Sequence, residues 1–211
     1  LVAGDTKVVE RGSADKLFIN TTGVGFIPPG RSVGPQKITP GDKVIVTGTM
    51  GDHGIAIMSE REGLSFSSPV LSDCAPLNKL IESFIVPGVK CMRDPTRGGL
   101  ATTLNELAGQ AGLSIVIEEE RVPVLPAVRG ACDMLGLDPL YLANEGKAIV
   151  IVAPEVEEQV LRDMQRHPLG KDAKTIGEVV QGDPGLVLLE TMLGARRILG
   201  MLEGEHLPRI C

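Results

Sequence analysis

An α/β fold of packed layers is predicted for this chain by three features of its sequence. Segments with an apolar stripe at helical spacing alternate with short runs that are rich in β-branched residues. Glycine and proline separate many of these segments, which is typical of turns between the strands and helices of a layered sheet. The chain has 211 residues, enough to bury a substantial core and to hold one or two domains.

The N-terminal part predicts a strand followed by a linker. Residues 16–27 are rich in β-branched and aromatic side chains and predict a strand that ends at Pro28. Proline and glycine are frequent over 28–42, and Pro40-Gly41-Asp42 is a turn signal, so we place a domain boundary near residue 40. Because the chain begins with neither an initiator methionine nor a signal peptide, we expect it to be a fragment.

The remaining elements follow from the periodicity of the apolar residues. Helices are expected where these recur every three or four positions, and Gly112 is expected to cap the helix that carries Leu104. In chain order we expect a strand at 43–48, helices at 51–62, 77–84 and 100–111, strands at 113–120 and 147–153, a helix from Pro154, and strands at 173–180, 185–190 and 195–201, the last two joined as a hairpin across 192–194.

Charge and composition exclude several classes of protein. A net charge of -6 and the lack of a Lys/Arg-rich stretch argue against nucleic-acid binding. No apolar run approaches the ~18 residues that cross a bilayer, so we expect no membrane association. The cysteines Cys74, Cys91, Cys132 and Cys211 form no CxxC pair and no zinc spacing, which fits reduced thiols in the cytoplasm. We expect the first three to be partly buried small hydrophobes.

The loop that begins at Asp94 is the strongest internal candidate for a binding site. Gly98 and Gly99 stand where an amphipathic helix begins, so the backbone can approach a ligand and the first helical N–H groups can hold a phosphate. Arg97 adds a forked cationic donor, and Asp94 can hold Mg²⁺ against the same phosphate. The plainer interpretation is a tight turn in which Asp94 or Thr96 caps the helix, and spacing alone leaves both open.

A second glycine-rich turn, Gly48–Gly54, joins an expected strand to an expected helix. Its spacing is neither that of a P-loop nor that of a dinucleotide-binding turn. We expect His53 to start the helix or pack against it, because a chain with only three histidines offers little support for a histidine triad or a zinc site.

Three single residues are further candidates. Lys7 follows the turn Gly4-Asp5-Thr6, and Glu145 directly precedes an expected strand, where a carboxylate can serve as a general base. Each also fits an ordinary solvated turn. Cys211 is the last residue, and it is either an accident of a frayed end or a thiol carried by a terminal arm, residues 204–211.

Taken together, these segments resemble the HypE family of hydrogenase maturation factors, in the superfamily of aminoimidazole ribonucleotide synthetase and selenophosphate synthetase. The internal loops alone would indicate the superfamily, and the C-terminal Pro-Arg-Ile-Cys singles out the HypE family. The segments that carry the resemblance are Gly4–Val9, Gly48–Gly54, Asp94–Leu100, Asn144–Gly146 and Pro208–Cys211.

The resemblance implies a PurM-like two-domain fold whose first domain is incomplete. Residues 1–40 would be the remnant of an N-terminal ATP-binding domain, and 41–190 the C-terminal PurM-like domain, a mixed sheet with packed helices. Residues 191–211 would form a final strand and a mobile tail that ends in Cys211. The absent part of the first domain carries further metal-binding aspartates and most of the family's dimer interface, so the full-length protein is expected to be a homodimer.

The resemblance also implies an ATP-dependent dehydration. In the family, the carbamoyltransferase HypF loads a carbamoyl group onto the terminal thiol, ATP activates the amide oxygen, and loss of phosphate leaves a thiocyanate. The cyanide then passes to the iron of NiFe hydrogenase through the HypC–HypD complex. The roles carried over are Cys211 as the thiol, Glu145 as the base, Lys7 as a stabiliser of negative charge, Asp94 as the Mg²⁺ ligand, and ATP contacts by Asp5, Thr6, Asp94, Thr96, Arg97, Gly98 and Gly99.

Two other interpretations stay open. A small-molecule ATP-dependent synthetase or kinase of the same superfamily would explain the glycine loops and leave Cys211 without a role. A non-catalytic carrier scaffold would bind partners without hydrolysing a nucleotide. A metal chaperone is weaker, because the terminal arm carries one Cys and one His and zinc prefers four ligands.

Overall fold

A computed structural model describes residues 2–14, 17–63 and 70–202. The chain divides into two compact units, Leu1–Arg31 and Ser32–Cys211. The domain limits expected from the sequence, with a boundary near residue 40, stay a prediction.

The first unit has no helix and no strand among its described residues, so the strand predicted at 16–27 is wrong. Residues 17–27 are irregular, and their large apolar side chains are exposed, Phe26 at 97%. A strand is stabilised by a neighbouring strand and by burial of one face, and the described part of this unit supplies neither. Its local order consists of turns, such as the one in which the N–H of Ser13 donates to the carbonyl of Glu10 at 3.0 Å.

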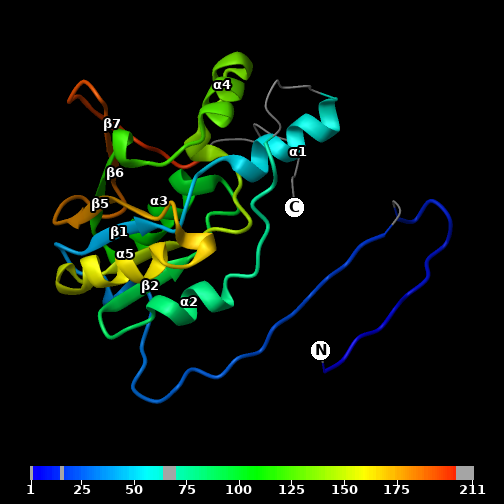
Figure 1. Cartoon of the computed structure of the whole chain (residues 1–211), viewed down its shortest axis with the longest axis horizontal. Coiled ribbons are helices and arrows are strands. Elements are labelled where there is room, and N and C mark those ends of the chain that lie inside the picture. The colour runs from blue at the N-terminus through cyan, green and yellow to red at the C-terminus, as the bar shows by residue number, and fades with distance from the viewer. Residues whose placement is uncertain (1, 15–16, 64–69, 203–211) are drawn as a thin grey trace. The chain divides into compact units, whose positions relative to one another are not determined.

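The second unit is built on a seven-stranded mixed sheet with the order β2-β4-β1-β5-β3-β6-β7 (Figure 1). Neighbouring strands are antiparallel except for the parallel pair of β3 and β6. The strands are β1 (Lys43–Val46), β2 (Val89–Arg93), β3 (Ser114–Glu118), β4 (Ile149–Val152), β5 (Lys174–Val180), β6 (Val187–Glu190) and β7 (Arg196–Ile198).

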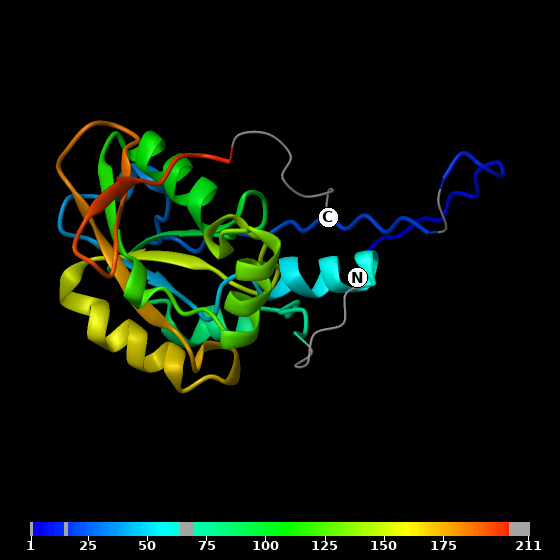
Figure 2. The ribbon, with the colours of Figure 1, turned by 90° about the horizontal axis from the view of Figure 1, so that it is seen from above.

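Helices cover both faces of this sheet. Along β1 the side chains alternate: Val44 and Val46 enter the core under α3, and Ile45 enters the core under α2 and α5. In Figure 2, α3 (green) and α5 (yellow) accordingly lie on opposite sides of the sheet. The helices are α1 (Asp52–Glu62), α2 (Asn78–Phe84), α3 (Gly99–Ala111), α4 (Pro126–Leu135) and α5 (Glu157–Gln165).

A third apolar cluster joins α1 to α4. Ile55 of α1 packs there with Val128, Ala131 and Cys132 of α4 and with Leu142. This cluster supports the helix that follows the glycine-rich turn Gly48–Gly54. None of the helices in the described residues is long and apolar enough to cross a membrane.

The expected α/β layers, the hairpin of β6 and β7, and the cap at Gly112 (φ 68°) are confirmed. Two elements are absent from the sequence-based prediction, β2 and α4. After Val89, β2 has only unbranched residues, which weakens the strand signal. The pattern of α4 is interrupted by Gly130, and its buried face is short.

Candidate functional site

A buried asparagine joins three of the segments singled out in the sequence. Asn144 is fully buried, and its Oδ1 accepts from the N–H of Gly51 at 2.7 Å. Its Nδ2 donates to the carbonyls of Leu142 at 2.8 Å and Pro95 at 3.3 Å. The turn at Gly51, the loop at Pro95 and the segment before β4 therefore meet at one side chain.

The Asn144→Ala substitution in the full-length protein is expected to destabilise the fold by about 3 kcal/mol. It removes the side-chain partner of the buried N–H of Gly51 and of the carbonyl of Leu142, at about 1–3 kcal/mol for each unsatisfied group, whereas the carbonyl of Pro95 keeps the backbone N–H of residue 144. Urea unfolding followed by circular dichroism measures the loss as a lower transition midpoint. Asn78→Ala, at the exposed start of α2, is the matched control and should shift the midpoint little; equal shifts in both variants would contradict this role for Asn144.

The loop at Asp94 leads into α3 without a side-chain cap. Gly98 adopts a left-handed conformation (φ 66°) in a tight turn, as the plainer interpretation expects, but no side chain caps the helix, so the cap expected from Asp94 or Thr96 is wrong. Thr96 Oγ1 instead donates to the carbonyl of Asn144 at 3.3 Å. Asp94 and Arg97 are exposed. The start of α3 can therefore accept an anion, with Arg97 as a neighbouring cation.

Gly99 is required by the fold itself. A Cβ at this position would lie 2.6 Å from the carbonyl oxygen of Leu142 and 2.7 Å from that of Leu140. The chain before β4 thus passes directly against the first residue of α3. This close approach explains a glycine here, and a contact of Gly99 with phosphate stays a prediction.

Glu145 lies next to this junction and has an unused acceptor. Its side chain is half-buried, and its Oε1 is buried with no hydrogen-bond partner in the described structure. Buried acceptors are nearly always satisfied, so an oxygen left without a protein donor is available to an N–H group of a ligand. The predicted base therefore has one carboxylate oxygen that the described residues leave free to accept a hydrogen bond.

The sequence-based prediction did not single out a charged cluster beside Glu145. Lys147 Nζ lies 3.3 Å from Asp73 Oδ2 and 3.9 Å from Asp52 Oδ2, and its side chain is 12% exposed. Burial raises the pKa of Asp52, which the hydrogen bond from Thr49 and the charge of Lys147 partly oppose. Lys147 stands only two residues after Glu145, and this proximity in the sequence could have indicated it. Asp73 lies in an irregular segment whose sequence gave no such indication.

His53 and the described cysteines have defined surroundings. His53 is buried, as expected for a packing residue, with Nδ1 2.9 Å from Ser72 Oγ and 3.8 Å from Cys74 Sγ. Cys91 and Cys132 are buried as expected, and burial raises the pKa of both thiols, that of Cys132 to about 11. Cys74 is exposed, so its expected burial is wrong.

For a magnesium ion, the described residues supply one candidate ligand. Asp94 presents an exposed carboxylate at the start of the loop. The described part of the chain holds no group of three His, Cys, Asp or Glu side chains that could bind a metal by themselves. Mg²⁺ commonly binds through one or two carboxylates together with water and substrate phosphates, and Asp94 fits that arrangement.

The other predicted residues are not joined to this site by the structure. Asp5, Thr6 and Lys7 are exposed in the first unit, where the N–H of Thr6 donates to Asp5 Oδ1 at 2.8 Å. Their grouping with Glu145 stays a prediction. Cys211 lies outside the described residues.

The last described residues follow α3 toward its N-terminal end. The carbonyl of Leu199 accepts from Asn105 Nδ2 at 2.8 Å, and three residues later the N–H of Leu202 donates to Thr102 Oγ1 at 3.3 Å. Thr102 in turn lies against Gly98, where an added Cβ would meet its Oγ1. Leu202, the last described residue, therefore lies next to the loop that precedes α3.

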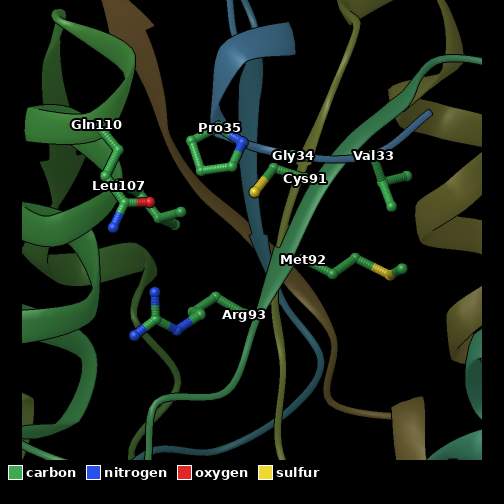
Figure 3. A pocket seen from close by; sticks show the side chains of 8 residues that line it. All are labelled: Val33, Gly34, Pro35, Cys91, Met92, Arg93, Leu107 and Gln110. Carbon is green, nitrogen blue, oxygen red and sulfur yellow. The ribbon is translucent and has the colours of Figure 1, made fainter. Parts of the chain in front are cut away.

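A separate pocket of about 190 Å³ lies between β2 and α3. Figure 3 shows Cys91 and Arg93 pointing from β2 toward Leu107 and Gln110 of α3, while Met92 points to the other face. The pocket is smaller than the ~300–1,000 Å³ of typical ligand sites, and no predicted site residue lines it. We assign no ligand to it.

Comparison with known proteins identifies the family. The family model described as "AIR synthase related protein, C-terminal domain" matches residues 39–188. The chain belongs to this family. Over its whole length it is 52% identical to the carbamoyl dehydratase HypE of Bradyrhizobium diazoefficiens and 49% identical to that of Escherichia coli K12. It spans 62% of the length of each of these relatives.

Solved structures agree with this membership. The crystal structure of E. coli HypE matches with a TM-score of 0.85 and 47% identity, over 89% of this chain and 58% of that one. HypE in complex with ATP matches with a TM-score of 0.80 and 46% identity, over 85% and 55% of the two chains. The HypE–HypF complex matches with a TM-score of 0.77 and 46% identity, over 81% of this chain and 56% of that one. The PurM-like fold class implied by the resemblance is confirmed.

Proposed function

We propose that this chain supplies the base and the terminal thiol of an ATP-dependent carbamoyl dehydratase. The observation that carries the proposal is the 52% identity, over the whole chain, with a protein named carbamoyl dehydratase HypE. The geometry supports it, because Glu145 offers an unused buried acceptor beside an uncapped helix start. The reaction would convert a carbamoyl group on the sulfur of Cys211 into a thiocyanate, a source of cyanide for the iron of NiFe hydrogenase.

The chemistry needs a phosphorylated oxygen and a base. The group S–C(=O)–NH₂ must lose its oxygen and two protons to become S–C≡N. Amide oxygen is a poor leaving group, and transfer of the terminal phosphoryl group of ATP to it makes it a good one. The C–O bond then breaks, phosphate and ADP leave, and the two N–H protons pass to bases. Overall, the S-carbamoyl group and ATP give the thiocyanate, ADP, phosphate and one proton.

Glu145 is the residue that we assign to accept an N–H proton. Its Oε1 has no donor among the residues that the structure describes, so a substrate N–H can donate to it before the proton transfers. The neighbouring Asn144 is fully buried and hydrogen-bonds to the backbone of Gly51 and of Pro95. These bonds hold the backbone of the segment before β4 in place. Lys7 would stabilise negative charge on the reacting group.

We assign the phosphates of ATP to the start of α3. The helix begins without a side-chain cap, and the exposed Arg97 and Asp94 flank it. Asp94 would hold Mg²⁺, which neutralises phosphate charge when bound. Further contacts would come from Asp5, Thr6, Thr96, Gly98 and Gly99. A related HypE has been crystallised with ATP, which supports nucleotide binding at this fold.

The terminal arm has the length that the reaction requires. From Leu202, which hydrogen-bonds to Thr102 of α3, the nine residues 203–211 span at most ~30 Å when extended. Cys211 can therefore reach the start of α3 and the neighbourhood of Glu145. Cys91 and Cys132 cannot replace it, because they are buried and their thiol pKa is raised.

We further propose the partners and the compartment. A HypE–HypF complex has been crystallised, which supports HypF as the donor of the carbamoyl group. The HypC–HypD complex would receive the cyanide, the full-length protein would be a homodimer, and the reaction would take place in the cytoplasm.

Labelling the carbamoyl oxygen tests the proposed route. If ATP activates that oxygen, full-length protein carrying an oxygen-18 carbamoyl group on Cys211 should release phosphate that contains one oxygen-18 atom per thiocyanate formed. Mass spectrometry of the phosphate measures the transfer, and unlabelled carbamoyl protein in oxygen-18 water is the control. Phosphate labelled from water alone would mean that ATP is merely hydrolysed, and would refute activation of the amide oxygen.

A further inference from the structure

The carboxylate of Asp73 lies directly against the backbone of the proposed base. Its Oδ1 accepts from the N–H of Glu145 at 3.0 Å and from the N–H of Gly146 at 3.3 Å. The Asp73 side chain is 2% exposed. Hydrogen bonds to an ionised acceptor are stronger than neutral ones, and two successive N–H groups on one oxygen determine the orientation of the peptide that joins them.

Lys147 compensates the charge of this buried carboxylate. Its Nζ lies 3.3 Å from Asp73 Oδ2, the oxygen that does not face the backbone, and 3.9 Å from Asp52 Oδ2. Burying an ion is unfavourable unless it is paired, so the ammonium group of Lys147 offsets part of the cost of burying Asp73 here. Asp73 thus contacts the backbone of Glu145 with one oxygen and Lys147 with the other.

The backbone is shaped to allow this contact. A Cβ at position 146 would lie 1.7 Å from the carbonyl oxygen of Asp73, so the segment at 73 can pass here only against a glycine. A Cβ at Gly48 would lie 2.9 Å from Lys147 Cε, so a second glycine leaves room for the lysine. Two glycines from separate motifs therefore serve the same cluster.

We propose that Asp73 is a positioning residue that aims Glu145 at its substrate, an inference that rests on the proposed function. Within the described part of the chain Glu145 Oε1 has no hydrogen-bond partner, so no hydrogen bond from these residues to that oxygen orients the carboxylate. The backbone at position 145 sets the direction in which its side chain leaves the chain, and Asp73 holds that backbone through two hydrogen bonds. Lys147 acts on Glu145 through Asp73.

A double-mutant cycle in the full-length protein tests the role in the reaction. Asp73→Ala should lower kcat for thiocyanate formation by about 10- to 100-fold, with KM for ATP changed less than about twofold, because the base is misplaced and the nucleotide site is not. Asp73→Asn keeps one oxygen for the two N–H groups and should recover most of kcat. In a Glu145→Gln background, Asp73→Ala should have little further effect, since it acts through Glu145.

Additive losses in the two backgrounds, or a kcat unchanged by Asp73→Ala, would overturn the proposal. Amide hydrogen exchange tests the contact independently of any activity and without a variant. The amides of Glu145 and Gly146 should be protected in the wild-type protein, and Asp73→Ala should expose them. Fast exchange of these two amides in the wild-type protein would refute the contact, whether or not the variant folds. Protected amides in a protein that carries out no dehydration would refute the proposed function and leave the contact standing.

Discussion

A Cys211→Ala variant of the full-length protein is expected to form no thiocyanate. It is also expected to consume no ATP in response to the carbamoyltransferase and its donor. The proposed reaction occurs on the sulfur of Cys211, so an alanine removes the substrate itself and the loss is complete. Phosphate release, measured with and without the carbamoyltransferase, reports the coupled ATP consumption.

Cys74 is a matched control, because it is an exposed thiol in the described part of the chain. Cys74→Ser should keep coupled ATP consumption within about twofold of the wild type, since Cys74 is exposed and has no role in the proposed reaction. Coupled consumption that survives Cys211→Ala would point to a small molecule as the acceptor. That result would favour a synthetase or kinase of the same superfamily over the dehydratase.

Glu145→Gln is expected to reduce the rate of thiocyanate formation by about 10²- to 10⁴-fold, the usual contribution of a general base. The amide is nearly the same size and keeps an acceptor oxygen, so ATP binding and the fold should change little. Single-turnover kinetics on full-length protein carbamoylated at Cys211 separate the chemical step from binding.

The control for this variant is Glu158→Gln, an exposed glutamate on α5. It should leave the rate within about twofold of the wild type. A Glu145→Gln rate close to that of the control would show that the proton passes to another base, and the assignment of Glu145 would fail.

The layers of the second unit were predictable because their signals are local. The stripe of α3 and the cap at Gly112 depend on residues a few positions apart, and the fold uses them as expected. The strand expected at 16–27 had an equally good local pattern. It failed because a strand also needs a partner, which the described part of the first unit does not supply.

The site was predictable only as separate motifs. The glycine turns and the segment before β4 were identified from the sequence. That they meet at Asn144 depends on contacts between residues about 50 and 90 positions apart. Asp73 was not predictable at all, because its segment has neither periodicity nor a motif. Its role depends on a contact with Glu145, which is 72 positions away in the sequence. Aspartate in an irregular segment is usually solvated, so sequence alone gives no reason to select it.

Intact mass of the full-length protein, carbamoylated at Cys211, before and after addition of ATP and magnesium, tests the central claim most directly. We expect loss of one water, dependent on ATP and confined to the C-terminal peptide that contains Cys211. An unchanged carbamoyl adduct, with ATP consumed on another acceptor, would contradict it and leave Cys211 outside the reaction.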